Sequence, residues 1–140
     1  APRPAMPWSH LHWRINMALT KAFFEDYYRT YNSENPEALA ALYADDVVFN
    51  SAQGTSHGRD AILQTYRYLI ETFEDRMTPE SILIDGNHAA VEITDVFTAR
   101  EDVPDFMGAS LKKGEKLTLK LCGLYTVKDN RITQATIYAR

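Results

Sequence analysis

The sequence predicts a single α+β domain in which the helices come first and most of the strands follow. In the first half of the chain, apolar residues recur at spacings of three and four, which is the period of an amphipathic helix. In the second half, apolar and polar residues alternate, which is the period of a strand with one buried face. The change falls near Pro79, so we expect the order helix, helix, strand, helix and then four strands.

Two helices are predicted before the first strand. The first covers about residues 19–31 and buries an aromatic stripe made of Phe23, Phe24, Tyr27, Tyr28 and Tyr31. A buried tyrosine needs a hydrogen-bond partner, so this stripe indicates either an aromatic core or a cavity beside it. The second helix covers residues 36–43, with Asn35 as its N-cap and Pro36 in its first turn.

A short strand, a loop and a third helix follow. Residues 47–51 are β-branched and aromatic, which favours a strand, and residues 53–58 form a predicted loop that includes His57. The third helix begins at Arg59 and is expected to reach residues 73–75. Its buried stripe consists of Ile62, Leu63, Tyr66, Leu69, Ile70 and Phe73.

Four strands are predicted after Pro79, at residues 81–84, 89–100, 116–127 and 132–138. Turn residues separate the first two strands and the last two. Segment 101–115 is a long predicted loop that carries the apolar residues Val103, Phe106, Met107 and Leu111. Such a loop often covers something, and a lid over a pocket and packing on the sheet edge are equally good interpretations.

Composition excludes several classes of protein. The chain has 140 residues, 45% of them hydrophobic and 24% charged, which is typical of a globular domain. A net charge of -4 argues against a nucleic-acid partner, and no apolar run has the roughly twenty residues of a membrane span. The single cysteine, Cys122, excludes an internal disulfide. We expect a cytoplasmic protein without a metal site or cofactor.

Residues 1–16 differ from the rest of the chain. They hold three prolines, Trp8, Trp13 and the His10-Leu11-His12 motif, without helical or strand periodicity. We interpret them as a leader or an added arm before a domain that covers residues 17–140. The alternative is an ordered arm that packs its tryptophans on the domain or on a partner subunit.

Strand 89–100 contains the most unusual chemical feature of the sequence. One of its faces reads Val91, Ile93, Asp95, Phe97, which places a single carboxyl in an apolar row. Removal from water raises the pKa of a carboxyl and makes it useful as an acid or base near neutral pH. Asp95 is therefore the candidate acid or base of a pocket.

Several stretches resemble the nuclear-transport-factor-2-like superfamily. They are residues 31–39, residues 42–47, the Gly58-Arg59-Asp60 motif, and residues 123–127 with Arg131 and Ile132. The resemblance covers nearly all of residues 17–140. It implies a cystatin-like cone, with three N-terminal helices packed on a strongly curved, mostly antiparallel sheet that encloses a pocket. This fold hosts isomerases, epoxide hydrolases, polyketide cyclases and non-catalytic modules, so the resemblance does not choose a function.

The epoxide-hydrolase members give a specific comparison. In limonene-epoxide hydrolase an Asp-Arg-Asp set, a Tyr and an Asn activate water. Of these five residues the resemblance matches only one aspartate, which falls on Asp95. The other four fall on Phe49, Ser51, Ile93 and Ile137. Standard epoxide hydrolysis is therefore not expected.

The isomerase and cyclase members give a second comparison. The base of ketosteroid isomerase falls on Ser51 and its oxyanion-hole aspartate on Gly123, while its oxyanion tyrosine falls on Tyr27. Ketosteroid isomerase activity is therefore not expected either. Polyketide cyclases of the SnoaL type use an acid/base aspartate on the pocket wall, which is a role that Asp95 can fill.

These comparisons lead to a predicted site. We expect a SnoaL-like pocket protein, an isomerase, cyclase or hydrolase acting on a hydrophobic small molecule, with Asp95 as acid/base and Tyr27 (or Tyr31) as hydrogen-bond donor. The predicted ligand-binding residues are Tyr28, Tyr31, Phe49, Ser51, Ile93, Phe97, Phe106, Leu119, Leu121 and Ile137.

Two alternatives stay open. Asp95 can instead be structural, accepting hydrogen bonds from a buried tyrosine that fixes a helix on the sheet. The protein can also be a non-catalytic dimeric module that binds a ligand or another protein. A homodimer is expected in either case, because the outward row of strand 116–127 has the half-polar composition of a symmetric interface.

Overall fold

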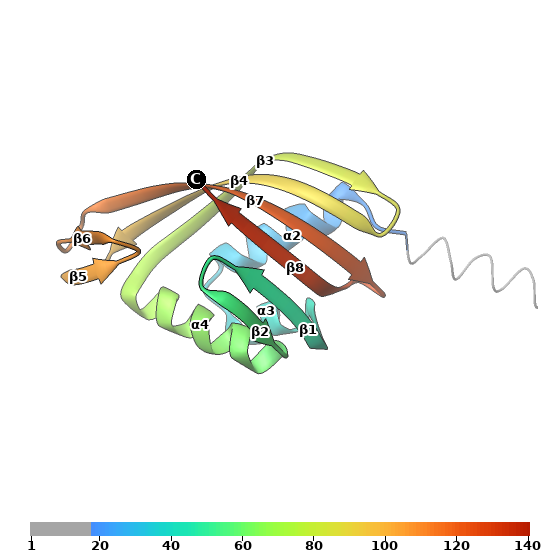
Figure 1. The fold of residues 1–140 in the computed structure, drawn as a ribbon, viewed down its shortest axis with the longest axis horizontal. Helices are drawn as coiled ribbons and strands as arrows, with labels where there is room; N and C mark the ends of the chain where they lie inside the picture. Colours follow the sequence, from blue (N-terminus) through green and yellow to red (C-terminus); the bar gives the residue numbers. More distant parts are fainter. Residues whose placement is uncertain (1–17) are drawn as a thin grey trace, which may run out of the picture.

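A computed structural model describes residues 18–140 as a long, curved sheet with three helices beneath its concave face (Figure 1). The predicted leader, with Trp8, Trp13, His10 and His12, lies outside the described residues. The helices are α2 (Lys21–Asn32), α3 (Pro36–Ala40) and α4 (Arg59–Thr72). In that part of the chain, no helix has the length and apolar character required to cross a membrane.

The two N-terminal helices follow the predicted pattern closely. The buried residues of α2 are Phe24, Tyr27, Tyr28 and Tyr31. The side chain of Asn35 caps α3 by accepting a hydrogen bond from the backbone N–H of Ala38 at 3.1 Å. Helix α3 is shorter than predicted, because Tyr43 already belongs to the first strand.

Six strands form the main sheet, in the order β2-β1-β8-β7-β4-β3. Neighbouring strands are antiparallel except β1 and β8, which are parallel, so the sheet is mostly antiparallel as expected. The strands predicted at residues 89–100, 116–127 and 132–138 are confirmed with small changes at their ends. The strands are β1 (Tyr43–Ser51), β2 (Gly54–His57), β3 (Phe73–Asp85), β4 (His88–Ala99), β7 (Lys116–Lys128) and β8 (Arg131–Ala139).

Strand β3 is the main departure from the sequence prediction. Residues 73–75 were expected at the end of the third helix, but α4 ends at Thr72 and Phe73 has extended backbone angles (φ -132°, ψ 158°). From Phe73 onward the chain pairs with β4, starting opposite Ala99. The pairing shifts between Pro79 and Ser81, where a residue without an N–H fits an interruption of the ladder.

Two segments predicted as loops contain short strands. Residues 53–58 include β2, which pairs with β1. Residues 101–115 include a hairpin of β5 (Val103–Phe106) and β6 (Ala109–Leu111), which Figure 1 shows at one end of the molecule. Its buried residues Val103 and Leu111 pack with Phe73 and Phe97 in a small core of their own. The segment thus packs at the end of the sheet, and its Phe106 and Met107 also line the cavity described below.

Candidate functional site

An apolar cavity of about 580 Å³ is lined by the concave face of the sheet, by α2 and α4, and by the two hairpins. This volume lies in the range of pockets that bind small molecules. All but one of the predicted site residues line it. They are Tyr27, Tyr31, Phe49, Ser51, Ile93, Asp95, Phe97, Phe106, Leu119, Leu121 and Ile137.

Tyr28 is the exception. Its side chain is 2% exposed and its hydroxyl hydrogen-bonds the hydroxyl of Tyr125 at 2.8 Å. Adjacent residues on a helix point about 100° apart, so Tyr27 reaches the cavity while Tyr28 packs into the main core. Tyr28 therefore does not line this cavity, in contrast to the other predicted residues.

The mouth of the cavity is marked by its exposed lining residues. Gln53, Gly54 and Thr55 come from the β1–β2 hairpin, and Met107 comes from the turn between β5 and β6. Tyr68 of α4, which is 50% exposed, completes this rim. The buried lining residues, Asp95 among them, lie deeper, so a bound ligand would have its inner end near that carboxyl.

Asp95 sits on the inner face of β4, as the alternation predicted, and is only 2% exposed. It is opposite Leu119 of β7 on one side and Met77 of β3 on the other. Both neighbours are apolar and line the cavity. The carboxyl therefore borders the cavity without contact with bulk water.

A second carboxyl, which the sequence analysis did not single out, lies beside it. Asp75 of β3 is 1% exposed, and its carboxyl lies close enough to that of Asp95 for each group to shift the pKa of the other. Within residues 18–140, Oδ1 of each aspartate is buried and has no hydrogen-bond partner. Two buried carboxyls this close to each other are not both ionised. One proton held between them supplies the hydrogen bond that the two oxygens lack, so the two groups act as a singly protonated pair.

The environment of the pair shifts both pKa values upward. Burial raises the pKa of Asp95 far above its usual range, and the hydrogen bond and negative charge of Asp75 raise it further. Burial also raises the pKa of Asp75, but the hydrogen bonds from Asp95 and Tyr31 and the positive charge of Arg76 oppose this shift. Asp95 is therefore the carboxyl that keeps the proton at neutral pH.

Tyr31 contacts the pair from α2. Its hydroxyl donates a hydrogen bond to Oδ2 of Asp75 at 2.7 Å, so this proton is already committed and Tyr31 is not the donor to a ligand. One alternative from the sequence was a structural aspartate that accepts a hydrogen bond from a buried tyrosine. Such a bond is present, but its acceptor is Asp75 and not Asp95.

Tyr27 forms a second polar pair, with Tyr43 at the start of β1. Their hydroxyls are hydrogen-bonded to each other and both residues line the cavity. Burial raises the pKa of Tyr27 to about 12, so both hydroxyls stay protonated. One proton joins the two oxygens, and the other has no partner in the described part of the chain. The pair thus offers one O–H donor at the cavity wall.

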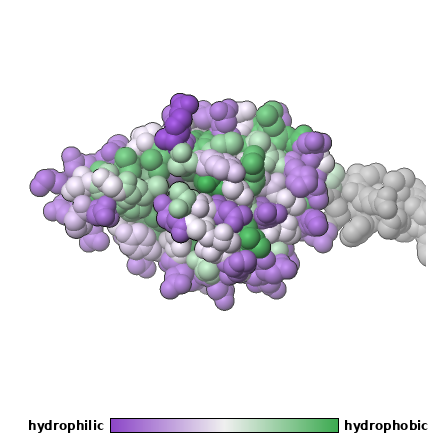
Figure 2. All heavy atoms as spheres, in the orientation of Figure 1, coloured by the Kyte–Doolittle hydropathy of each residue, from purple (hydrophilic) through white to green (hydrophobic). Residues whose placement is uncertain are grey.

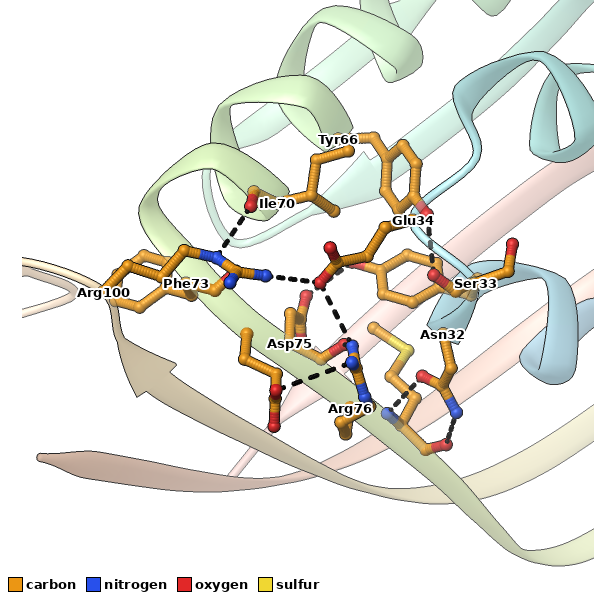
Figure 3. A network of polar contacts seen from close by, with 12 residues as sticks. Asn32, Ser33, Glu34, Tyr66, Ile70, Phe73, Asp75, Arg76 and Arg100 are labelled. Atoms are coloured by element: carbon orange, nitrogen blue, oxygen red, sulfur yellow. Dashed lines mark hydrogen bonds and ion pairs between the residues drawn. The ribbon is translucent and has the colours of Figure 1, made fainter. Parts of the chain in front are cut away.

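A network of polar contacts behind the carboxyls fixes the end of α2 against β3 (Figure 3). The side chain of Asn32 both donates to and accepts from the backbone of Met77 at 2.8 Å. Tyr66 of α4 donates from its hydroxyl to the carbonyl of Tyr31 at 2.6 Å. These contacts hold the Tyr31 hydroxyl in register with Asp75.

One pattern in the sequence could have identified Asp75 as a site residue. Phe73, Asp75 and Met77 alternate, and they occupy the inner face of β3 just as Ile93, Asp95 and Phe97 occupy that of β4. The helical spacing of the preceding residues concealed this alternation. Tyr43 gave no comparable signal, because it lay at the end of a predicted helix.

Comparison with known proteins gives the family. The profile of the SnoaL-like domain matches residues 24–135, which is most of the chain. The chain belongs to the SnoaL-like domain family. It is a SnoaL-like protein with a pocket of small-molecule size, as the sequence analysis predicted, and its fold confirms the nuclear-transport-factor-2-like cone. Comparison with curated proteins gives no significant match.

Solved structures share the fold of this SnoaL-like protein. A candidate polyketide cyclase from Xanthomonas campestris pv. campestris has a TM-score of 0.72 and 20% identity, over 84% of this chain and 87% of that one. An epoxide hydrolase from M. tuberculosis, described as similar to limonene-epoxide hydrolase, has a TM-score of 0.69 and 18% identity, over 85% and 80%. A protein with a ketosteroid isomerase-like fold from Catenulispora acidiphila has the same TM-score and identity, over 86% of each chain.

Proposed function

We propose that this SnoaL-like protein is an acid–base enzyme that moves a proton on an apolar, carbonyl-containing small molecule. The observation that carries the proposal is the buried Asp75–Asp95 pair, of which Asp95 lines an apolar cavity. A neutral carboxyl can donate a proton to an oxygen of a ligand, whereas an ionised one has no proton to give. The structural neighbour described as a candidate polyketide cyclase, and the one described as having a ketosteroid isomerase-like fold, support this class of chemistry.

The simplest reaction that the pair supports is conversion of a ketone to its enol. Asp95 gives its proton to the carbonyl oxygen from one carboxyl oxygen, and its other carboxyl oxygen takes a proton from the α-carbon. The electrons of the C–H bond form the C=C bond, and those of the C=O π bond form the new O–H bond. The pair is singly protonated again at the end, so no other reactant is consumed. Isomerisation and carbon–carbon ring closure both begin with this step.

Deuterium exchange tests the proposal without knowledge of the natural substrate. In D2O, 2-tetralone, a compact apolar ketone, exchanges its α-hydrogens slowly, and NMR follows the exchange. We expect the wild-type protein to accelerate it, and Asp95→Asn to lose about a hundredfold or more of that acceleration, the usual contribution of a general acid or base. Asp85→Asn, which changes an exposed carboxyl on the β3–β4 turn, is the matched control. Full exchange activity in Asp95→Asn would contradict the proposal.

The non-catalytic alternative predicts a different result in the same samples. If the protein only holds a ligand, saturation transfer from protein to ketone would show binding, while the wild-type protein would leave the exchange rate at its buffer value. That outcome would replace the enzyme with a ligand-binding module.

We also propose that the protein is a homodimer that uses the outer face of its sheet. Leu83, Leu124 and Tyr138 are 66%, 45% and 58% exposed on this face, and Figure 2 shows apolar residues among the polar ones near the β3–β4 end. Light scattering should give a particle mass of twice the chain mass for the wild-type protein and of one chain mass for Leu124→Glu. A monomer at every concentration would contradict this. The cytoplasmic location predicted from the sequence is tested by fractionation of expressing cells.

A further inference from the structure

We propose that Tyr31 and Arg76 hold the negative charge of the carboxyl pair on Asp75 and so keep its proton on Asp95, the carboxyl that borders the cavity. This inference rests on the proposed function and gives two residues outside the reaction a positioning role. It also states what the substrate meets at the inner end of the cavity, which is an O–H donor rather than an anion.

The hydrogen bonds around the two carboxyls are unequal. Asp75 accepts a hydrogen bond from the Tyr31 hydroxyl at 2.7 Å, a donor that burial and the nearby Asp75 keep protonated by raising the pKa of Tyr31. Oδ1 of Asp95 has no hydrogen-bond donor within residues 18–140, and Leu119 and Met77 flank this residue. A hydrogen bond to the charged form stabilises that form, so the charge settles on Asp75.

The positive charge of Arg76 also favours ionisation of Asp75 rather than Asp95. Arg76 follows Asp75 in β3, and its guanidinium donates to the backbone carbonyl of Asp75 at 3.4 Å. Glu34, in the link between α2 and α3, fixes that guanidinium at 3.3 Å, and Arg100 also contacts Glu34, at 2.5 Å (Figure 3). Glu74 lies 3.6 Å from Arg76 on its other side.

The remaining titratable groups that face the two carboxyls do not move the negative charge away from Asp75. Tyr66 of α4 is neutral, because burial raises its pKa to about 12. The negative charge of Glu34 raises the pKa of Asp75 and partly offsets Arg76, but it is the smaller of the two effects. Arg76 is about 40% exposed, so solvent weakens its field, and Tyr31 contributes more than Arg76.

The proton position is measurable without any ligand. Aspartate labelled with ¹³C at its carboxyl carbon gives NMR signals that report the protonation of Asp75 and Asp95 separately, with Asp75→Asn and Asp95→Asn to assign them. At neutral pH the wild-type signals should show Asp95 protonated and Asp75 ionised. In Tyr31→Phe and in Arg76→Gln, the Asp75 signal should move toward the protonated position and the Asp95 signal toward the ionised one.

This reciprocal movement distinguishes a positioning role from a structural one, because general loosening of the site would shift both signals toward those of solvated carboxylates. Arg67→Gln, on the exposed face of α4, is the control and should leave both signals in place. If Tyr31→Phe does not fold, Arg76→Gln carries the test, since its side chain is partly exposed. Signals that stay at their wild-type positions, or that move together, would overturn the inference. Failure of deuterium exchange in the wild-type protein would instead contradict the enzyme and leave this result standing.

Discussion

Asp75 and Asp95 are diagonal neighbours across the β3–β4 ladder, since Asp75 is opposite Phe97 and Asp95 is opposite Met77. Residues two apart on a strand share a face, so this register puts both carboxyls on the concave side. Both are almost completely buried, and burial of two adjacent carboxyls is tolerated only when one of them is protonated. The antiparallel register thus creates an acid inside an apolar cavity.

The buried pair should make stability depend on pH in an unusual direction. The pKa of Asp95 is raised in the folded state, so above the unfolded value of about 3.9 the folded chain binds more protons than the unfolded one. The free energy of unfolding should therefore fall as pH rises, by at most about 1.4 kcal/mol per pH unit for one proton. Urea denaturation between pH 5 and pH 8 measures this slope.

Asp95→Asn should flatten that slope, because the amide does not titrate, while Asp85→Asn should keep it. A free energy of unfolding that rises with pH in the wild-type protein, or a slope unchanged in Asp95→Asn, would show that the pair is ionised in the folded state.

Two adjacent tyrosines should respond differently to loss of their hydroxyls. Tyr27→Phe removes an oxygen at the cavity wall, and we expect it to lower ketone exchange by about tenfold to a hundredfold, in the range found for a single hydrogen-bond donor. Tyr28→Phe breaks a buried bond to Tyr125 at 2.8 Å and should cost about 1 kcal/mol of stability with little effect on exchange. Equal exchange rates for both variants would remove Tyr27 from the site.

Filling the cavity should block the ligand without unfolding the protein. Leu119 lies directly opposite Asp95 and lines the cavity, so Leu119→Trp should weaken binding of 2-tetralone at least about tenfold, which corresponds to 1.4 kcal/mol. Leu83→Trp adds the same bulk at an exposed position on the outer face and should bind normally. Ketone binding is measured by saturation transfer and stability by urea denaturation. Unchanged binding in Leu119→Trp would place the ligand elsewhere.

Local periodicity predicted the parts of the fold that depend on local burial. The face of β4 that carries Ile93, Asp95 and Phe97 and the aromatic stripe of α2 follow directly from spacing, and both are confirmed. These elements line much of the cavity, so most of the residues that were predicted for the site do line it.

What was missed depends on contacts between distant segments. Phe73 continues the helical spacing of Tyr66, Leu69 and Ile70, and only its pairing with Ala99 of β4 makes it the start of a strand. With residues 73–75 interpreted as helix, Asp75 could not be placed beside Asp95. Strand β2 was missed for the same reason, because its polar residues form a strand only by pairing with β1.

The carboxyl titration of Asp95 in the wild-type protein tests the central claim most directly. The sample carries ¹³C-labelled aspartate, and Asp95→Asn assigns the signal. We expect the carbon signal to show that the Asp95 carboxyl is protonated at pH 7 and ionises only well above the usual range of a carboxyl. An Asp95 carbon that titrates at or below about 3.9, the value for a solvated aspartate, would show that no protonated pair exists and would contradict the proposed acid.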